Sequence, residues 1–428
     1  MSELPIFALV LFIYVMAARL ALSLDDRRYR SGLFALVNIA GFVVLSLFIH
    51  YSVWKDETIL DLGAPAVLRH VSLTIFYVVL VALGYFLLRV FAGRPGMLPW
   101  LAFFYPIALL IVFKYFYFAW DPLMDRLDWP EWVIASTIIG LSYMAFRLSH
   151  LVLEVRNGVV EVPNLGEYLA FAFFLPTLVV GPINPYSTHQ RSLNSAGGGS
   201  VRTEARAALR IVVGAAKFLF LANIANQLTY SGLFLDGKPH SLIDLFVAVI
   251  FFYLFLYLNF SGFCDIAIGL AGLLGIRVRE NFNNPFVATN VKDFWNRWHI
   301  TLSEYTRDVI FTPVTKGLIQ KFGAKHANFC ISVGILCVFL VIGVWHGVGI
   351  FFVIFGLIHA AGVISNHYYT LWLKRKLGKD RYKAYNENRL VNAVAIFLTF
   401  AYVASSFVFF ANTRDTLGQI KYAIVSGF

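Results

Sequence analysis

The chain presents a succession of apolar stretches, each close to the length that a helix needs to cross a lipid bilayer. Crossing the hydrocarbon core takes about 20 predominantly apolar residues. No soluble linker or internal repeat divides these stretches. We therefore predict an all-α polytopic membrane protein with about 10 to 11 transmembrane helices, forming one domain over residues 1–428. The candidate spans are residues 5–24, 31–53, 71–92, 97–119, 131–149, 165–183, 208–226, 242–262, 329–345, 348–370 and 390–411.

Composition agrees with a membrane protein and excludes several other classes. Of the residues, 59% are hydrophobic and 14% are charged, which is typical of integral membrane proteins. Three cysteines cannot form a disulfide framework, and Cys330 and Cys337 would stand about 10 Å apart on one helix. The basic residues behind the net charge of +11 lie in loops between candidate spans, as the positive-inside rule predicts. We therefore expect no nucleic-acid partner.

The charges of the loops predict the orientation. Residues 371–389 carry seven basic and two acidic side chains, which indicates a cytoplasmic loop. Residues 120–131 carry four acids and one arginine and are expected outside. The N-terminal run lacks the basic leader of a signal peptide, so we interpret it as a retained first span with its N-terminus outside.

One candidate span does not fit the alternation of successive loops between the two sides of the membrane. Residues 165–183 follow Arg147 and Arg156, which we count as cytoplasmic loop charges, and further arginines come after them. The stretch "FFLPTLVVGPINP" is also interrupted by glycine and prolines. Irregular backbone inside a membrane is tolerated only where protein or a watery cavity satisfies its polar groups. We predict a broken or re-entrant element there, which leaves ten crossings and both termini outside.

Residues 277–328 contain no candidate span but concentrate polar and aromatic side chains. They include "NFNNPF" (281–286), "DFWNRWHITLSEYTRD" (293–308) and the amphipathic run "YTRDVIFTPVTKGLIQKF" (305–322). Amphipathic helices of this kind lie in the membrane interface. We therefore expect short helices in or dipping into the cytoplasmic half of the membrane, lining a passage.

His346 is the histidine most deeply placed in an apolar region. It lies in "VIGVWHGVGIFF", within residues 329–370. Ionisable side chains at that depth are costly and are usually functional. Gly343, Gly347 and Gly349 remove side chains around it, which lets a substrate or another backbone approach. The alternative is a packing histidine bonded to a carbonyl group, and burial does not decide between the two.

His299 is the second candidate, because it stands in a dense polar and aromatic cluster with Asn296, Arg297 and Trp298. Burial lowers the pKa of an imidazole, so that it stays neutral near pH 7 and can accept a proton. The two histidines, or one histidine with a hydrogen-bonding partner, are therefore candidates for a base and an orienting group that act on a hydroxyl nucleophile.

Other chemistries find less support in the sequence. There is no GxSxG elbow, no HExxH and no ligand-spaced set of histidines and cysteines, so neither a serine nucleophile nor a metal site is predicted. Cys264 is a possible nucleophile without a supporting motif. Asp265 is either the partner of another intramembrane charge, such as Lys217, or part of a catalytic site.

Several motifs in order resemble the membrane-bound O-acyltransferase (MBOAT) superfamily. They are "ENFNNPF", "KDFWNRWHITLS" and "GVWHG", together with "GLSYMAFRLSHLVLEVRNG" (140–158) and "FFLPTLVVGPI" (173–183). The resemblance is to the bacterial branch that includes the D-alanyl transfer protein of teichoic acid synthesis and the alginate O-acetyltransferase. It covers roughly residues 135–370, which we interpret as the catalytic core.

The resemblance implies tilted helices around a central tunnel. A thioester donor, either acyl-CoA or a phosphopantetheinyl acyl carrier protein, would enter from the cytoplasm, and no cofactor would be bound permanently. The acceptor hydroxyl of an envelope polymer would enter from the other side. The same resemblance implies that His346 deprotonates the acceptor and that His299 with Asn296 orients or stabilises the developing oxyanion, while the sequence leaves open which histidine acts first. The residues expected to line the tunnel are Asn296, Arg297, Trp298, Trp295, Trp345, Ser303, Asp308 and Asp265.

The motifs divide between the two kinds of enzyme in this branch. "KDFWNRWH" and the chain length are similar to the D-alanyl type, and "FSGFCDIAIGL" is similar to the alginate type, but the Gly-Gly-Asn-Arg element of the latter is missing after Asp308. The acyl group and the acceptor therefore stay open.

The resemblance also implies partners and a location. We expect membrane lipid around the protein, an acyl carrier protein docked at residues 307–323, an extracytoplasmic acyl-relay partner, and the bacterial cytoplasmic (inner) membrane as location. The alternative function is a secondary transporter or flippase for an envelope precursor, although no pseudo-symmetric pair of interrupted spans supports it.

Overall fold

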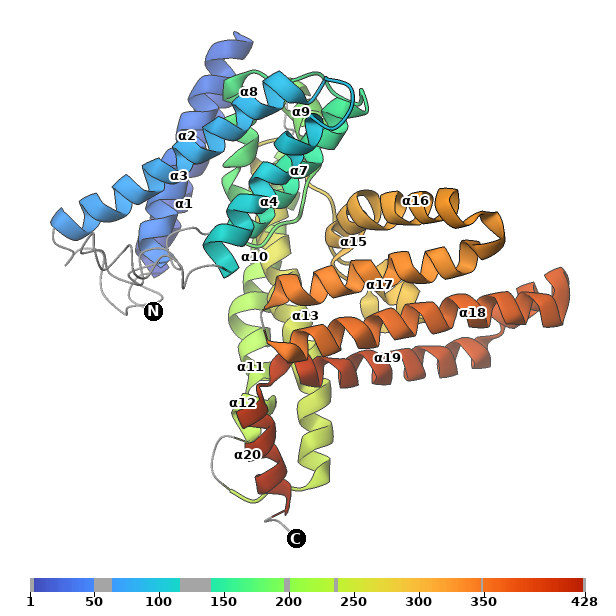
Figure 1. Cartoon of the computed structure of the whole chain (residues 1–428). Coiled ribbons are helices and arrows are strands. Elements are labelled where there is room, and N and C mark those ends of the chain that lie inside the picture. The colour runs from blue at the N-terminus through green and yellow to red at the C-terminus, as the bar shows by residue number, and fades with distance from the viewer. Residues whose placement is uncertain are drawn as a thin grey trace, which may run out of the picture. The chain divides into compact units, whose positions relative to one another are not determined.

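Helices make up nearly all regular structure in the part of the chain that the computed structural model describes (Figure 1). The described residues are 4–49, 64–115, 140–195, 201–234, 238–347 and 349–425. The acidic loop 120–131 and the ends of two candidate spans, 50–53 and 116–119, lie outside them. Within the described residues the prediction of an all-α fold is confirmed.

Seven described helical stretches are long and apolar enough to cross a membrane, so the chain is a multi-pass membrane protein. They are Arg27–Phe48, Val71–Phe91, Val201–Asn226, Leu242–Leu273, Ala324–His346, Ile350–Glu387 and Arg389–Ala411. Three shorter apolar stretches, Ala8–Leu22, Pro99–Tyr115 and Leu165–Thr177, match further candidates. The candidate at 131–149 enters the described residues only at Gly140, where α7 (Leu141–Arg156) begins.

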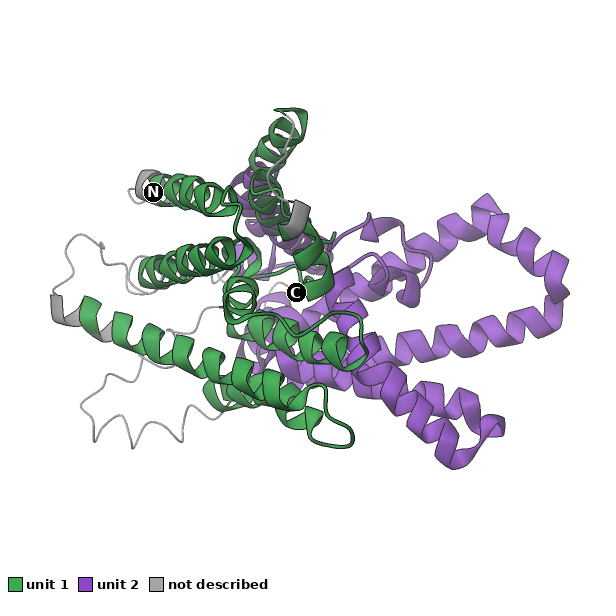
Figure 2. Cartoon of the chain, turned by 90° about the horizontal axis from the view of Figure 1, so that it is seen from above, with its two compact units in different colours: residues 1–212, 264–279 green, residues 213–263, 280–428 purple. Residues whose placement is uncertain are grey.

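The chain folds into two compact units, coloured separately in Figure 2. Unit 1 comprises Met1–Val212 and Cys264–Arg279, and unit 2 comprises Val213–Phe263 and Glu280–Phe428. Each unit is described by itself, and the expectation of a single domain over residues 1–428 stays a prediction.

Two helices of unit 1, α2 and α8, begin at side-chain caps. Asp26 accepts hydrogen bonds from the backbone of Arg28 and Tyr29 at the start of α2. Asn164 and Glu167 form a reciprocal capping box at the start of α8, which satisfies two otherwise unpaired N–H groups. The described helices of unit 1 are α1 (Leu4–Leu22), α2 (Arg27–Phe48), α3 (Ala64–Phe91), α4 (Pro99–Tyr115), α7, α8 (Leu165–Ala172), α9 (Tyr186–Ser195) and most of α10 (Val201–Ala215).

The predicted break in residues 165–183 is confirmed. Helix α8 ends at Ala172 and a single 3₁₀ turn, Leu175–Thr177, follows. Arg147 donates hydrogen bonds to the carbonyl oxygen of Phe171 (2.9 Å) and to that of Thr177 (2.7 Å). We call this arrangement the Arg147 clamp. The clamp provides hydrogen-bond donors to carbonyl groups of the irregular backbone, as a helix break inside a membrane requires.

The Arg147 clamp corrects one step of the orientation argument. Arg147 was counted as a loop charge, but it lies inside α7 and is 1% exposed. Its guanidinium is committed to carbonyl groups of unit 1 rather than to solvent. The loop-charge argument for this part of the chain therefore depends on Arg156, which is exposed at the end of α7.

Unit 2 contains the short helices expected for residues 277–328. They are α14 (Val291–Trp295), α15 (Ile300–Thr306) and α16 (Thr312–Phe322), with a π-helical segment, Arg307–Phe311, between the last two. The other described helices are α11 (Ala222–Asn226), α12 (Tyr230–Leu233), most of α13 (Leu242–Leu273), α17 (Ala327–His346), α18 (Ile350–Glu387), α19 (Arg389–Ala411) and α20 (Arg414–Val425). Helix α20 has no counterpart among the candidate spans.

Helices α17, α18 and α19 lie side by side in unit 2 (Figure 1). A Cβ atom added at Gly343 of α17 would lie 2.4 Å from the carbonyl oxygen of Phe352 in α18. One added at Gly356 of α18 would lie 2.3 Å from the carbonyl oxygen of Phe339 in α17. The two backbones therefore touch where both helices carry glycine, which is the close approach of another backbone that the sequence allowed at Gly343.

Candidate active site

The turn that carries His299 is held by the preceding asparagine-rich segment. Phe282 and Trp298 form an antiparallel bridge. The backbone N–H of Ile300 donates to the carbonyl oxygen of Asn281 (3.0 Å), and that of Asn283 donates to Arg297 (2.9 Å). "NFNNPF" and "NRWH" are therefore two segments of one local structure, joined by backbone hydrogen bonds.

His299 itself has a left-handed backbone, with φ of 46°. Few residues other than glycine adopt this conformation, although histidine and asparagine tolerate it better than most. Asn281 fixes the chain after it, since its side-chain oxygen accepts from the backbone N–H (3.1 Å) and the hydroxyl (2.8 Å) of Thr301. A strained residue held from both sides is a common property of functional sites.

The two candidate histidines share one aromatic neighbour, Trp345. Its ring centroid lies 6.1 Å from that of His299 and 4.6 Å from that of His346. His299 is 3% exposed. Burial, with a smaller contribution from the charge of His346, lowers the pKa of His299 to about 3. The imidazole of His299 is therefore neutral near pH 7, in agreement with the expectation from its sequence context.

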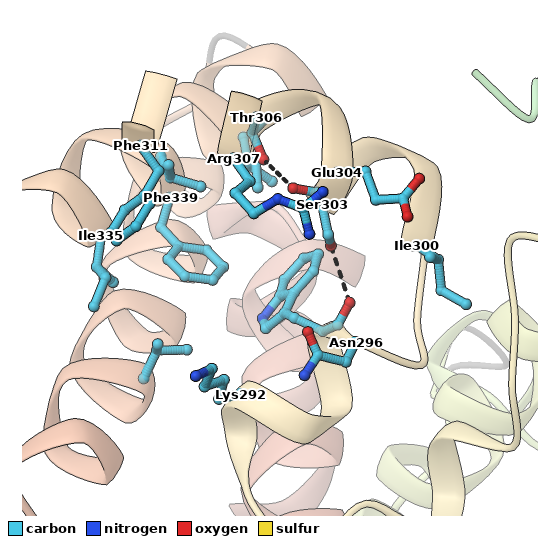
Figure 3. A pocket seen from close by; sticks show the side chains of 14 residues that line it. Lys292, Asn296, Ile300, Ser303, Glu304, Thr306, Arg307, Phe311, Ile335 and Phe339 are labelled. Carbon is cyan, nitrogen blue, oxygen red and sulfur yellow. Dashed lines mark hydrogen bonds between the residues drawn. The ribbon is translucent and has the colours of Figure 1, made fainter. Parts of the chain in front are cut away.

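A cavity of about 300 Å³ lies beside this turn (Figure 3). We call it the α15–α17 cavity. Ile335 and Phe339 of α17 form one side, and Asn296 and Ser303 lie on the other. Its polar edge also carries two cations and an acid, namely Lys292, Arg307 and Glu304.

The apolar side chains of α17 that line the cavity lie on the same face of this helix as His346. The wall residues of α17 are Ile335, Val338, Phe339 and Ile342. Side chains three and four positions apart share one face of a helix. The next positions on this face are 345 and 346, the sites of Trp345 and His346. The α15–α17 cavity and His346 therefore lie on one continuous face of α17.

Six of the eight predicted tunnel residues fall into three groups. Trp295, Asn296 and Ser303 line the cavity. Trp298 is buried among aromatic rings, including that of Phe294 at 5.6 Å. Two predicted residues form ion pairs at the edge of the site, Arg297 with Asp293 (2.9 Å) and Asp308 with Arg307 (3.2 Å).

Asp265 and Cys264 belong to unit 1, whereas the two histidines belong to unit 2. Asp265 accepts a hydrogen bond from Arg210 at 2.9 Å. This geometry matches the ion-pair alternative that the sequence left open, with Arg210 as the partner. Cys264 is buried.

Sequence reasoning missed His359 of α18, which is fully buried beside the cavity wall. Its Nδ1 accepts from the indole N–H of Trp295 (3.1 Å), and its Nε2 lies 3.0 Å from the hydroxyl of Ser406. The rule applied to His346 would have found it, because His359 is also a titratable residue inside an apolar span. Lys292 in the cavity lining was likewise not singled out.

We find no cluster of side chains suited to binding a metal ion in the described ranges. Among those residues, histidine, cysteine and acidic side chains nowhere gather in the groups of three that a bound ion needs. The imidazole of His299 and the amide of Asn296 can each donate and accept hydrogen bonds.

Comparisons with known proteins show which sequences this chain is similar to. The sequence profile of the MBOAT, membrane-bound O-acyltransferase family, matches residues 28–409. A teichoic acid D-alanyltransferase from Streptococcus thermophilus is 31% identical over 296 residues, which cover 66% of this chain and 70% of that protein. A probable alginate O-acetylase from Pseudomonas aeruginosa is 27% identical (71% of this chain, 55% of that protein), and a peptidoglycan O-acetyltransferase from Helicobacter pylori is 28% identical (51% and 41%).

Proposed function

Since this chain belongs to the membrane-bound O-acyltransferase family, we propose that it moves an acyl group from a cytoplasmic thioester to a hydroxyl of an extracytoplasmic envelope polymer. The family assignment makes the chain an O-acyltransferase and removes the transporter alternative. Relatives with the names of teichoic acid, alginate and peptidoglycan enzymes support an envelope polymer as acceptor and acetyl or D-alanyl as the acyl group.

The observation that carries the proposal is the continuous face of α17, which joins the α15–α17 cavity to His346. A volume of about 300 Å³ suits a slender arm such as pantetheine. Lys292 and Arg307 at the polar edge complement a phosphate group. The donor thioester would thus extend along α17 with its carbonyl group toward His346.

In the proposed reaction, His346 takes the proton of the acceptor hydroxyl as its oxygen attacks the thioester carbonyl carbon. The carbonyl oxygen becomes an oxyanion, which the neutral His299 and the amide of Asn296 stabilise by hydrogen bonds. The carbon–sulfur bond then breaks. The leaving sulfur receives the proton from His346, so that the products are an ester and a free thiol.

The partners follow from the same proposal. Residues 307–323 form an exposed basic surface next to the cavity, with Arg307, Lys316 and Lys321 on it. We place an acidic acyl carrier protein there, because opposite charges speed and orient docking. An acyl-relay partner would act outside, and lipid would surround the spans. Replacing Lys316 and Lys321 with glutamate should slow transfer from an acyl carrier but not from a free pantetheine thioester.

The proposed location is the bacterial cytoplasmic membrane with both termini outside. The seven cations of residues 371–389 support this orientation. Labelling with a membrane-impermeant thiol reagent tests it. A cysteine introduced at Lys379 should react only after the cells are opened, and one introduced near either terminus should react in intact cells.

The test of the function uses a deletion strain complemented with wild type, His346→Ala or His326→Ala. His326 is the matched control, because it is an exposed histidine at the opposite end of α17. The ester and D-alanyl content of the envelope polymers is measured by mass spectrometry, with protein abundance checked in each strain.

We expect one acyl ester to disappear with the deletion and to return with wild type and His326→Ala but not with His346→Ala. The missing ester then identifies the acceptor. If His346→Ala restores the ester fully, the assignment of the base is wrong. If no envelope ester depends on the chain, the proposed acceptor class is wrong.

A further inference from the structure

We propose that His359 is a positioning residue of this acyltransferase: it fixes the indole of Trp295, a wall of the α15–α17 cavity, and thereby sets the affinity for the acyl donor. The inference rests on the proposed function in one respect, namely that the donor occupies this cavity. Neither the family motifs nor the candidate histidines of the sequence include His359.

The hydrogen bonds determine which nitrogen of His359 carries the proton. The indole Nε1 of Trp295 can only donate, so the Nδ1 that receives it at 3.1 Å is unprotonated. Nε2 then carries the hydrogen and donates to the hydroxyl of Ser406 at 3.0 Å. That hydroxyl donates onward to the carbonyl oxygen of Val403 at 2.7 Å. One tautomer therefore satisfies a chain of three bonds from α14 to α19.

Aromatic packing holds the imidazole in this orientation. The rings of Phe294 and Phe339 lie nearly parallel to it, at 6.0 Å with an angle of 19° and at 6.1 Å with an angle of 23°. Phe355 meets the ring at 4.5 Å. His359 is fully buried, so the ring cannot turn without displacing side chains from three helices.

The effect reaches the cavity through Trp295. Trp295 and Phe339 line the cavity, whereas His359 does not. The carbonyl oxygen of Trp295 also accepts from the hydroxyl of Ser303 (3.0 Å), another lining residue. A buried indole N–H without an acceptor is costly. If His359 is removed, the indole must turn toward another acceptor, and the wall of the cavity changes shape.

A packing role and a positioning role predict different results. Leucine fills space at position 359 but accepts no hydrogen bond, whereas glutamine offers both an acceptor and a donor. Trp295→Phe removes the N–H that needs the acceptor. The informative set is therefore His359→Leu, His359→Gln, Trp295→Phe and the double variant, because a double-mutant cycle isolates the coupling between the two residues.

The experiment uses the full chain in lipid nanodiscs. The donors are pantetheine thioesters that carry acetyl or D-alanyl, and the acceptor is envelope material from the deletion strain. Release of free thiol gives KM for the donor and kcat, and thermal unfolding is followed in parallel. Ser406→Ala, which removes the partner of Nε2 only, serves as a milder variant if His359→Leu does not fold.

We expect His359→Leu to raise the donor KM about tenfold, equivalent to about 1.4 kcal/mol, with a much smaller change in kcat. His359→Gln should recover most of the loss, and Ser406→Ala should raise KM two- to threefold. In the Trp295→Phe background, His359→Leu should have little further effect.

Additive effects of the two substitutions, or a loss of thermal stability with an unchanged KM, would overturn the positioning role and leave His359 as a packing residue. A wild-type protein that releases no thiol from either donor would instead overturn the proposed function, so the two failures are distinguishable.

Discussion

The Arg147 clamp of unit 1 and the His299 turn of unit 2 (residues 296–299) are built from similar groups but differ in the space beside them. Both combine irregular backbone, a buried nitrogenous side chain and surrounding aromatic rings. Arg147 bonds to the carbonyl groups of Phe171 and Thr177. Its neighbours on α7 line a pocket of only about 10 Å³.

The His299 turn stands beside open space instead. Its residue Asn296 and the following residue Ile300 line a cavity of about 300 Å³. The cavity beside the His299 turn has room for a substrate, whereas the pocket beside α7, at about 10 Å³, holds at most one water molecule. We therefore infer a structural role for a buried polar residue where the side chains around it leave no large cavity, and a role in the reaction where such a cavity lies beside it.

The largest effect should come from His299→Asn. Asparagine tolerates the left-handed backbone at this position, so the fold should survive. Transfer activity should fall about 10²- to 10³-fold, because the variant lacks the imidazole that stabilises the oxyanion. The measurement is thiol release, with thermal unfolding as the control. Normal activity in a folded variant would place the chemistry elsewhere and remove the contrast between the two regions.

The next largest effect should be on stability, from Arg147→Met. This substitution leaves two buried carbonyl groups without their donor, which should lower the free energy of unfolding by about 3 kcal/mol. The protein that remains folded should keep normal specific activity. Arg156→Met, at the exposed end of the same helix, is the control. An Arg147 variant that is stable but inactive would show that the clamp serves the reaction.

A smaller effect is expected from the cations at the cavity edge. Arg307→Gln and Lys292→Gln should each raise the donor KM about three- to tenfold at low salt and less at high salt, since the side chain of Arg307 is 59% exposed. Lys383→Gln, also highly exposed, should change nothing. Equal effects at all three positions would indicate a general charge effect rather than a donor site.

The last effect concerns pH: it appears in both regions and is the smallest of the four near neutral pH. In unit 1, the ring of His189 in α9 lies 5.3 Å from that of Phe171, whose carbonyl group belongs to the Arg147 clamp. Burial lowers the pKa of His299 and of His189 to about 3, whereas an unfolded histidine has a pKa of about 6.5. Between these values the unfolded chain binds more protons, so stability rises with pH by about 1.4 kcal/mol per unit and per histidine. Above about pH 6.5 the dependence vanishes.

Substitution of either histidine by asparagine should therefore reduce the acid sensitivity of thermal unfolding by a similar amount. Only His299→Asn should also reduce activity. If His189→Asn reduced activity as strongly, the distinction between a filled and a hollow region would fail.

Much of the architecture could be predicted from local sequence. Apolar length predicted the spans, and the prolines and glycine of "FFLPTLVVGPINP" predicted the break after α8. The asparagine-rich and tryptophan-rich motifs pointed to the region where the cavity lies. Each of these patterns depends only on residues that are close together in the sequence.

The pairings between distant elements could not be predicted in this way. The sequence alone suggests that Arg147 is a loop charge, because the carbonyl groups that accept its hydrogen bonds lie 24 and 30 positions away. His359 depends on Trp295, 64 positions earlier, and on Ser406, 47 positions later. At Gly343, the sequence indicated a close approach but not that α18 makes it.

The π-helical segment Arg307–Phe311 has a consequence for how such a chain can diversify. Segments of this kind accommodate a residue more than the ordinary helical repeat allows. Losing one residue there would turn everything after it by about 100°, so that α16 would present a different face while α15 kept its own. Natural variation can therefore change the face that α16 presents, while the α15 residues that line the cavity, Ser303 among them, keep their place.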